Sequence, residues 1–495
     1  MELLFNDDLV YRKEGVRRVL GDVEKSPVPI ITPDRPWESE SLGRASVILD
    51  REQGVFKIWY RSSPMEAAAP DVGGAQAKPG NAFLCYGEST DGMSWTRPSL
   101  GLYEFGGSRD NNIVRELPPD IDTPFFNILK DPADPDPARR YKAISFDDST
   151  TSYLSDREDG ARGVCVSYSP DGFRWEEPRL VMSTDDLTDC DLVLGQRDPD
   201  TGMWVAYFRP RTHPKRRFIG ISESEDFDHW TYPRMLLAPD AGDDRWTEFY
   251  GLTAGCFGSW RVGCLWVMHN NPDLSTMTNE LVYSRGSKHY RRAMPRTQFL
   301  PLGPDGSVDS RMIQPIALVG REGDVLLYYR GTNRGHGSDR SRDGIGGVPM
   351  PPGRIDGEKR RSMLGVARIP GRNFCGLRAD GDGIVETCWL CNYGQGGVEA
   401  YAATDGEGWI RAEMLDQYGR VIPGWDLDSC SPEEGPGGRL TFHWGQRDLT
   451  GSCGQESQDG GRIGHVVRLR FQLHRATLFG FQVGEEGAMP PYKQW

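Results

Sequence analysis

The sequence lacks a long apolar run, an excess of basic residues and a secretory leader, and each absence argues against a class of protein. No stretch approaches 18 consecutive apolar residues, so no transmembrane helix is expected. Asp and Glu number 72 against 58 Lys and Arg, a net charge of −14, so we expect neither nucleic acid nor a membrane as partner. The N-terminus MELLFNDDLVYRKEG has no basic region followed by an apolar run, which predicts a cytoplasmic protein.

Common metal and catalytic motifs are also missing. Without a leader, the ten cysteines are expected to be reduced thiols. Cys388 and Cys391 form one CxxC pair, but Cys430 and Cys453 are 23 positions apart, which favours buried strand cysteines over a zinc site. The absence of GxSxG, HExxH and Walker A motifs, and of a GxGxxG between a strand and a helix, argues against serine hydrolases, zinc proteases and nucleotide-dependent enzymes. No cofactor is predicted.

What the sequence has in abundance is turns. Of 495 residues, 60 are Gly and 35 are Pro, and 10% are aromatic. Gly and Pro mark tight turns, and aromatic side chains suit half-buried strands. The composition therefore predicts an all-β protein with many short strands.

One turn recurs along the chain. The stretch CYGESTDGMSW at 85–95 returns as CVSYSPDGFRW at 165–175, and weaker copies lie at 220–230, 281–290 and 364–374. Each copy is a strand, a turn of about four residues and an aromatic side chain, which is the pattern of a β-hairpin. The aromatic positions are Trp95, Trp175, Trp230, Tyr290 and Phe374.

Two further β-rich segments precede each hairpin. They lie at 44–50 and 56–61, 125–131 and 140–146, 191–196 and 203–209, 252–258 and 263–269, and 313–320 and 324–330. Each unit thus supplies about four antiparallel strands, and radially repeated four-stranded sheets form a propeller. We predict a five-bladed β-propeller over 1–370, rather than unrelated hairpins in a sandwich. The alternating VVRLRFQL in a region without the repeat predicts a C-terminal β-sandwich over 371–495.

A carboxylate stands just before the first strand of every unit. In a propeller these strands line the central channel, so the carboxylates should converge on one funnel. Crowded carboxylates separate in pKa, so one can be protonated while another is ionised, and such a pair cleaves glycosidic bonds. The same groups could instead hold Ca²⁺ or Mg²⁺, or cap turns. The catalytic candidates are Glu38 (with Glu40 beside it), Asp122, Asp189, Asp191 and Glu248.

Aromatic, basic and polar side chains flank these carboxylates. Trp and Tyr stack on the apolar faces of sugar rings, and Arg donates hydrogen bonds to hydroxyls and carboxylates. The long polar segment 333–360 after the fifth unit is expected to be a loop that could bring a His to the mouth of the funnel. The candidates for substrate binding are Trp37, Arg61, Arg209, Trp246, Tyr250, Asp309, Arg311 and His336.

With its S-x-DG-x-x-W hairpins, five units and C-terminal domain, the chain resembles the glycoside hydrolases of families 32, 43, 68 and 117. LYEFGGSRDNNIV at 102–114 is similar to uncharacterised bacterial relatives of family 32. The hairpins also resemble the Asp-box of sialidases, but that motif has one more residue between Asp and Gly and belongs to six-bladed propellers. The resemblance covers nearly the whole chain.

Family 32 places an Asp nucleophile on blade one, an Arg-Asp-Pro motif on blade two and a Glu-Cys acid on blade three. Here Glu38 or Glu40 stands on blade one without the Asn-Asp-Pro-Asn-Gly motif of the family. Asp122 has no Arg before it, and Asp189-Cys190 carries an acid shorter by one methylene. A shift of about 1 Å can cost about 10²-fold in rate, so the acid could instead be Glu248.

The resemblance implies a glycoside hydrolase acting on a furanoside-type (fructoside or arabinofuranoside-like) or uncommon oligosaccharide. The alternatives are a carbohydrate-binding propeller without catalysis and a structural or protein-interaction propeller. The sequence leaves open the sugar and its linkage, retention or inversion, and which carboxylate is the acid. It also leaves open a divalent cation in the funnel and a homo-oligomeric state.

Overall fold

The computed structural model describes residues 1–38, 42–63, 82–117, 127–147, 163–183, 193–212, 216–271, 274–321, 323–335, 361–392, 397–416, 418–435, 438–447 and 465–484. In these ranges the regular structure is β, apart from short 3₁₀ turns such as η2 (Pro137–Arg139), and there is no α-helix. The prediction of an all-β protein is confirmed. No helix in the described ranges has the length and hydropathy needed to cross a bilayer.

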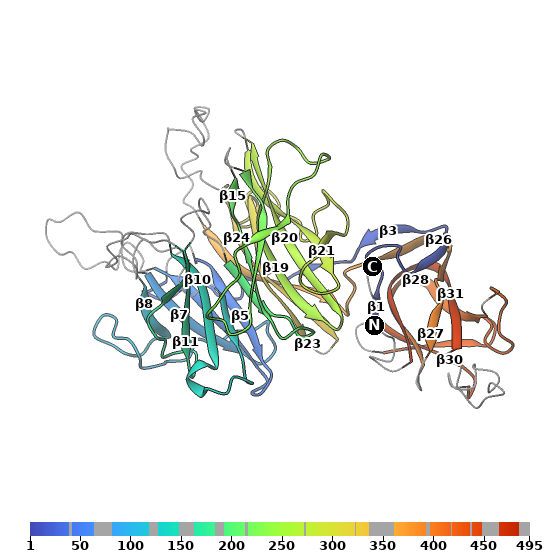
Figure 1. Cartoon of the computed structure of the whole chain (residues 1–495), viewed down its shortest axis with the longest axis horizontal. Helices are drawn as coiled ribbons and strands as arrows, with labels where there is room; N and C mark the ends of the chain where they lie inside the picture. The colour runs from blue at the N-terminus through green and yellow to red at the C-terminus, as the bar shows by residue number, and fades with distance from the viewer. Residues whose placement is uncertain are drawn as a thin grey trace.

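Three consecutive antiparallel sheets of four strands follow the predicted repeat (Figure 1). The first unit contains β5 (Ala45–Asp50), β6 (Val55–Ser62), β7 (Ala82–Ser89) and β8 (Ile113–Leu117). The second contains β9 (Asn127–Lys130), β10 (Tyr141–Asp147), β11 (Gly163–Ser169) and β12 (Arg179–Ser183). The third contains β13 (Val193–Arg197), β14 (Trp204–Phe208), β17 (Ile219–Ser224) and β18 (Arg234–Leu237), with the small hairpin β15 (Arg211–Thr212) and β16 (Arg216–Arg217) inserted.

The fourth and fifth units share one eight-stranded sheet. The fourth contains β19 (Thr247–Phe257), β20 (Trp260–Asn271), β21 (Leu274–Ser284) and β22 (Arg291–Arg292). The fifth contains β23 (Met312–Arg321), β24 (Asp324–Thr332) and β25 (Ser362–Pro370), and a parallel pairing of Met277 with Met312 joins it to the fourth. Its last strand is β4 (Glu24–Lys25), so a segment from near the start of the chain completes the last unit.

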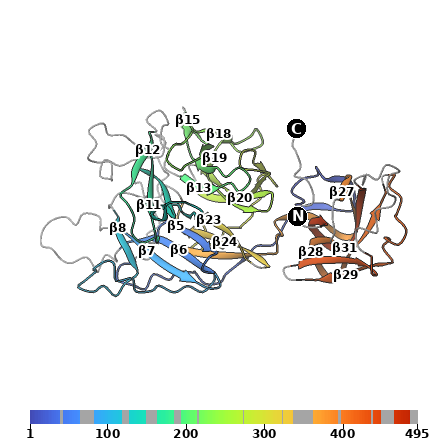
Figure 2. The same cartoon turned by 60° about the horizontal axis from the view of Figure 1, so that its bottom comes forward.

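The first strands of the units contact one another in a closed ring. The contacts run from β5 to β9, β13, β19 and β23, and from β23 back to β5 (Figure 2). All five strands line one central cavity of about 130 Å³. Side chains join neighbouring first strands where the backbones do not pair: Ser46 Oγ donates to the Ile128 carbonyl at 3.1 Å, and Thr253 Oγ1 donates to the Pro315 carbonyl at 2.8 Å.

The recurring Ser-x-Asp-Gly turn is held by its own polar atoms. In the second unit the Gly172 amide donates to Ser169 Oγ at 2.9 Å, and the Arg174 amide donates to Asp171 Oδ1 at 2.8 Å. The turn needs a left-handed residue, and Gly172 has φ +82°. The Gly172 carbonyl then accepts from Trp59 Nε1 of the first unit at 2.8 Å, so the turn also attaches one unit to the next.

Replacing Gly172 by alanine should therefore destabilise the protein more than the same change at Gly202. Both glycines have positive φ, which by itself costs about 1–2 kcal/mol with a side chain. A Cβ at Gly172 would lie 2.7 Å from Trp59 Cζ2, whereas a Cβ at Gly202 meets no atom within 4 Å. We expect Gly172→Ala to cost about 1–3 kcal/mol beyond Gly202→Ala, because of overpacking. Midpoints of thermal unfolding measure the difference. Equal midpoints for the two variants would contradict the role of Gly172 in attaching the second unit to Trp59 of the first.

Ion pairs link consecutive units at the ends of their first strands. Lys130 Nζ lies 2.6 Å from Asp50 of the first unit, and Arg197 lies 2.7 Å from Asp131 of the second. Arg261 of the fourth unit lies 2.7 Å from Asp198 of the third. Asp50 also contacts Lys57 at 2.8 Å, and despite burial these two lysines lower the pKa of Asp50 to about 2.

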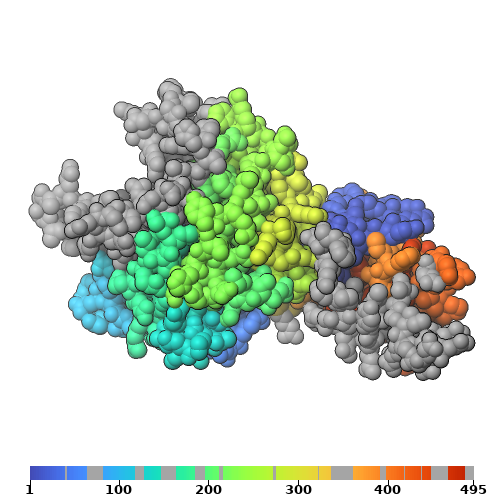
Figure 3. Space-filling model, in the orientation of Figure 1, coloured from blue at the N-terminus to red at the C-terminus, as the bar shows by residue number. Residues whose placement is uncertain are grey.

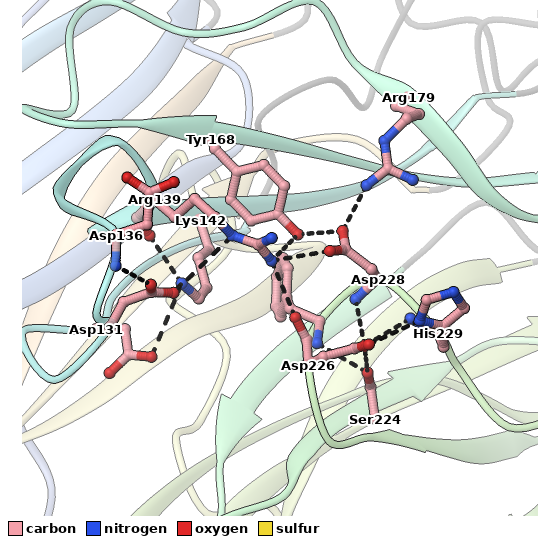
Figure 4. Close-up of polar contacts among 12 residues, drawn as sticks. Asp131, Asp136, Arg139, Lys142, Tyr168, Arg179, Ser224, Asp226, Asp228 and His229 are labelled. Carbon is pink, nitrogen blue, oxygen red and sulfur yellow. Dashed lines mark hydrogen bonds and ion pairs between the residues drawn. The ribbon is translucent and has the colours of Figure 1, made fainter.

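A second polar network joins the second and third units on their outer strands (Figure 4). The Arg139 guanidinium lies over the Tyr168 ring, 4.1 Å from its centroid, and 2.9 Å from Asp228. The Tyr168 hydroxyl donates to Asp228, which also accepts from Arg179. Asp228 belongs to the third copy of the hairpin, so the hairpins position neighbouring units and contribute scaffold.

The C-terminal residues form a separate nine-stranded sheet, shown in orange and red in Figure 1. Its strands are β26 (Cys375–Thr387), β27 (Leu390–Asn392), β28 (Val398–Leu415), β29 (Cys430–Glu434), β30 (Arg439–Trp444) and β31 (His465–Val483), together with β1 (Glu2–Leu3), β2 (Val10–Glu14) and β3 (Arg17–Leu20). The predicted boundary at 370 thus falls at the end of β25, but residues 2–20 pair with the C-terminal sheet and not with the repeat units. These short strands carry no repeat pattern, so the sequence did not indicate their partners.

The N-terminal segment also packs against the repeat units. The Phe5 ring stacks on Tyr283 with centroids 4.6 Å apart, and it lies edge-on to Trp260 at 5.3 Å. Glu2 forms an ion pair with Arg285. Figure 3 shows this segment in blue beside the orange and red C-terminal residues. The segment therefore helps to hold the C-terminal sheet against the fourth unit.

Candidate active site

Glu248 and Tyr250 lie at the start of β19, one of the five strands of the central ring. A β-bulge between Phe249 and Gly251 interrupts the pairing of β19 with β20 at this point. Bulges are common beside active sites because they redirect side chains. Glu248 is 4% exposed and forms an ion pair with Arg217 of β16, in the third unit.

Tyr250 is surrounded by arginines from different units. Arg209, which is fully buried, lies over the Tyr250 ring with its guanidinium carbon 3.9 Å from the centroid, and Arg217 lies at 5.5 Å. Burial by itself would raise the pKa of Tyr250, but the charges of Arg209, Arg44 and Arg217 outweigh it and lower the pKa. Arg44 precedes β5 of the first unit, so side chains from three units meet at Tyr250.

Two further arginines lie around residues 42–44. The Gly43 amide donates to the Arg61 carbonyl at 2.9 Å, and the Arg61 side chain lies directly beside Gly43. Arg330 of β24 donates to the Leu42 carbonyl at 3.1 Å and to Gln314 at 3.0 Å. We call Arg44, Arg209 and Arg217, whose charges act on Tyr250, the arginine cluster. Such a set can bind anionic oxygens or many hydroxyls at once.

Glu38 and Trp37 are placed in the interior. Glu38 has no exposed surface, and its carboxylate accepts from the Tyr60 hydroxyl at 2.6 Å and from Arg97 at 2.7 Å. Burial raises the pKa of Glu38 in spite of these two donors. Trp37 is also buried, and its indole N–H donates to Asn112 at 2.9 Å. Their described contacts are those of the core, and the Glu38 carboxylate is already held by Tyr60 and Arg97.

The other described candidates lie in different surroundings. Asp309 forms an ion pair with Lys25 of β4 at 2.6 Å and accepts from Ser307 at 2.8 Å, so it supports the fifth unit. Arg311 lies 3.7 Å from the exposed Asp305. Trp246 is half-buried, with the Arg245 guanidinium carbon 5.0 Å from its ring centroid.

Four predicted site residues, Asp122, Asp189, Asp191 and His336, lie outside the described residues, as does Glu40. Of the remaining candidates, the structure brings Arg209, Glu248 and Tyr250 together through Arg217, and it places Arg61 beside Gly43, next to Arg44 in the sequence. Within the described ranges, no group of three or more His, Cys, Asp or Glu side chains is arranged to hold a metal ion.

Sequence reasoning missed Arg44 and Arg217. Arg44 directly precedes the first strand, in GRASVILD, at the position where carboxylates were sought. Arg217 lies in the basic run PKRRF, which has no repeat counterpart. A search for every charged residue before a first strand, rather than for carboxylates alone, would have found Arg44.

No family model matches the chain, and no curated protein matches it. Among solved structures, it is similar to the family 32 β-fructofuranosidase of Bombyx mori, with 12% identity, 94% of each chain covered and a TM-score of 0.40. It is also similar to an N-acetylgalactosamine deacetylase from F. plautii, with 13% identity, 72% of this chain and 95% of that chain covered, and a TM-score of 0.45. A third is the β-1,2-mannobiose phosphorylase of Listeria innocua, with 12% identity, 70% and 96% covered, and a TM-score of 0.42.

The similar structures include further glycoside hydrolases, among them a family 62 α-L-arabinofuranosidase from Coprinopsis cinerea. The three chemistries named above, hydrolysis, deacetylation and phosphorolysis, differ from one another. With TM-scores below 0.5, these likenesses carry no functional argument, which must come from the site itself.

Proposed function

We propose that the protein is a glycoside hydrolase whose active site lies where the first strands begin, around Glu248. The observation that carries this proposal is the meeting of Glu248 and Tyr250 of the fourth unit with arginines of the first and third units at one end of the central ring. A carboxylate surrounded by an aromatic ring and hydrogen-bond donors is suited to the charge that develops on a sugar during cleavage.

The roles follow from the partners of each group. Glu248 forms an ion pair with Arg217, so its carboxylate is suited to act as nucleophile, base or stabiliser of oxocarbenium charge. The acid would then be a second carboxyl. Asp122, Asp189 and Asp191 remain the candidates, because each precedes the first strand of its unit in the sequence.

We also propose that the repeat units are the blades of a five-bladed β-propeller followed by a C-terminal β-sandwich. The closed ring of first strands and the shared cavity support the propeller, and the length and bulges of β26, β28 and β31 support a sheet folded over its own core. A furanoside-type substrate, a cytoplasmic location and a homo-oligomeric state remain predictions from the sequence.

The second candidate is a carbohydrate-binding propeller without catalysis, favoured by the burial of Glu38 at the position of the blade-one nucleophile. Incubation with a panel of fructosides, arabinofuranosides and other oligosaccharides separates the two. We expect release of reducing sugar that is linear in enzyme concentration. Sugar binding in a calorimeter with no release from any member of the panel would favour the second candidate.

A further inference from the structure

We propose that the arginine cluster binds an anionic oxygen group of the substrate, such as the carboxylate of a uronic acid. The inference rests on the proposed function and narrows it to acidic sugars. Carboxylate and phosphate share this chemistry, since the planar guanidinium fork is complementary to both.

Arg217 provides the geometric basis. One of its terminal nitrogens pairs with Glu248, whereas its Nε is buried and has no hydrogen-bond partner within the described residues. A buried donor without an acceptor is unfavourable, because no hydrogen bond offsets its loss of water. Such donors in native proteins call for an explanation, and a ligand oxygen that enters the site would supply the missing acceptor.

Arg209 provides the second element of the subsite. It is fully buried with its guanidinium on the face of Tyr250, so its position is set by the protein before any ligand arrives. A preorganised cation loses little conformational freedom on binding. The lowered pKa of Tyr250 supports a positive potential at this point, although the whole chain carries a net charge of −14. A neutral sugar would make no use of that potential.

The test is isothermal titration at low salt with three probes: D-glucuronate, D-glucose and inorganic phosphate. Glucuronate and glucose differ only at C6, so their comparison isolates the carboxylate. We expect glucuronate to bind at least about 10-fold more tightly than glucose. Arg217→Ala should abolish that preference, measured as the ratio of the glucuronate and glucose affinities of the same variant, whereas Arg217→Lys should retain part of it, because it keeps the charge and loses the fork.

The matched control is Arg234→Ala, which removes the same charge from an exposed arginine that pairs with the buried Glu223 in the same unit. It should leave all three affinities unchanged, and thermal unfolding of each variant verifies its folding. Tighter binding of phosphate than of glucuronate would support an anion subsite and identify phosphate, rather than a carboxylate, as the group that it binds. Equal binding of glucose and glucuronate, or binding of neither, would overturn the proposal.

Parallel turnover assays on neutral glycosides and on glucuronides separate this result from the proposed function. Hydrolysis of neutral glycosides without a preference for glucuronate would support the proposed hydrolase function and contradict the proposed anion subsite. A preference for glucuronate with no hydrolysis of either set would support the anion subsite and contradict the hydrolase function.

Discussion

Replacing Glu248 by glutamine lowers kcat by at least about 10²-fold and leaves the fold intact. Loss of one group that acts as base or nucleophile typically costs 10²–10⁴-fold in rate. The amide of glutamine has nearly the same shape and can still accept a hydrogen bond from Arg217, so the packing at the start of β19 should survive. Loss of the charge opposite the largely buried Arg217 should lower the midpoint of thermal unfolding without preventing folding. The measurement is kcat and KM on the best substrate of the panel, together with the midpoint of thermal unfolding.

Glu280→Gln is the matched control. Glu280 is also a buried glutamate paired with an arginine, Arg292 at 2.7 Å, and it lies on β21 of the same unit. Glu280→Gln should keep kcat within about twofold of the wild type, since acid–base and nucleophilic effects require contact with the reacting atoms. Near-normal turnover in Glu248→Gln, or an equal loss in both variants, would remove Glu248 from the proposed catalytic group.

Replacing Asp50 by asparagine destabilises the protein by about 3 kcal/mol or more. Asp50 is buried and holds two lysines, Lys57 within the first unit and Lys130 from the second. Removal of one partner from a buried ion pair typically costs about 3–5 kcal/mol, because the remaining charge is left uncompensated. Thermal and denaturant unfolding measure the loss, and the wild type at the same pH is the reference.

The effect should depend on pH with a defined sign. The pKa of Asp50 is about 2 in the folded protein against an ordinary value of 3.8, so its charge stabilises the fold above about pH 4. That contribution, about 2 kcal/mol, is lost as the pH falls from about 4 towards 2. The difference between wild type and Asp50→Asn should therefore shrink over this window.

Asp380→Asn is the matched control for this prediction. The pKa of Asp380 is also lowered to about 2, by Arg17 and Arg378, but the group is exposed to solvent. Exposed ion pairs contribute little to stability, so the midpoint should barely move. Equal destabilisation by both substitutions would show that burial of Asp50 is not the cause.

The sequence alone determined the local and repeated features of this protein. The Ser-x-Asp-Gly turn is made by hydrogen bonds within a few residues, as between Ser169, Asp171 and Gly172, so its pattern is visible in one segment and can be counted along the chain. The order of strands in the first four units followed from the same count, because consecutive strands of a meander pair with their neighbours. The last strand of the fifth unit, β4, comes from the start of the chain and was not indicated by the count. Glu248, Tyr250 and Arg209 were found because repetition marks equivalent positions.

Only the tertiary structure decided which side chains meet. Arg217 and Glu248 are separated by 31 positions and belong to two different units. Glu38 is enclosed by Tyr60 of β6 and by Arg97 of the loop between β7 and β8. The pairing of residues 2–20 with the C-terminal sheet is of the same kind. Burial and ion pairing depend on which distant segments come into contact. A sequence pattern predicts such contacts only where it repeats, because repetition identifies equivalent positions in different units.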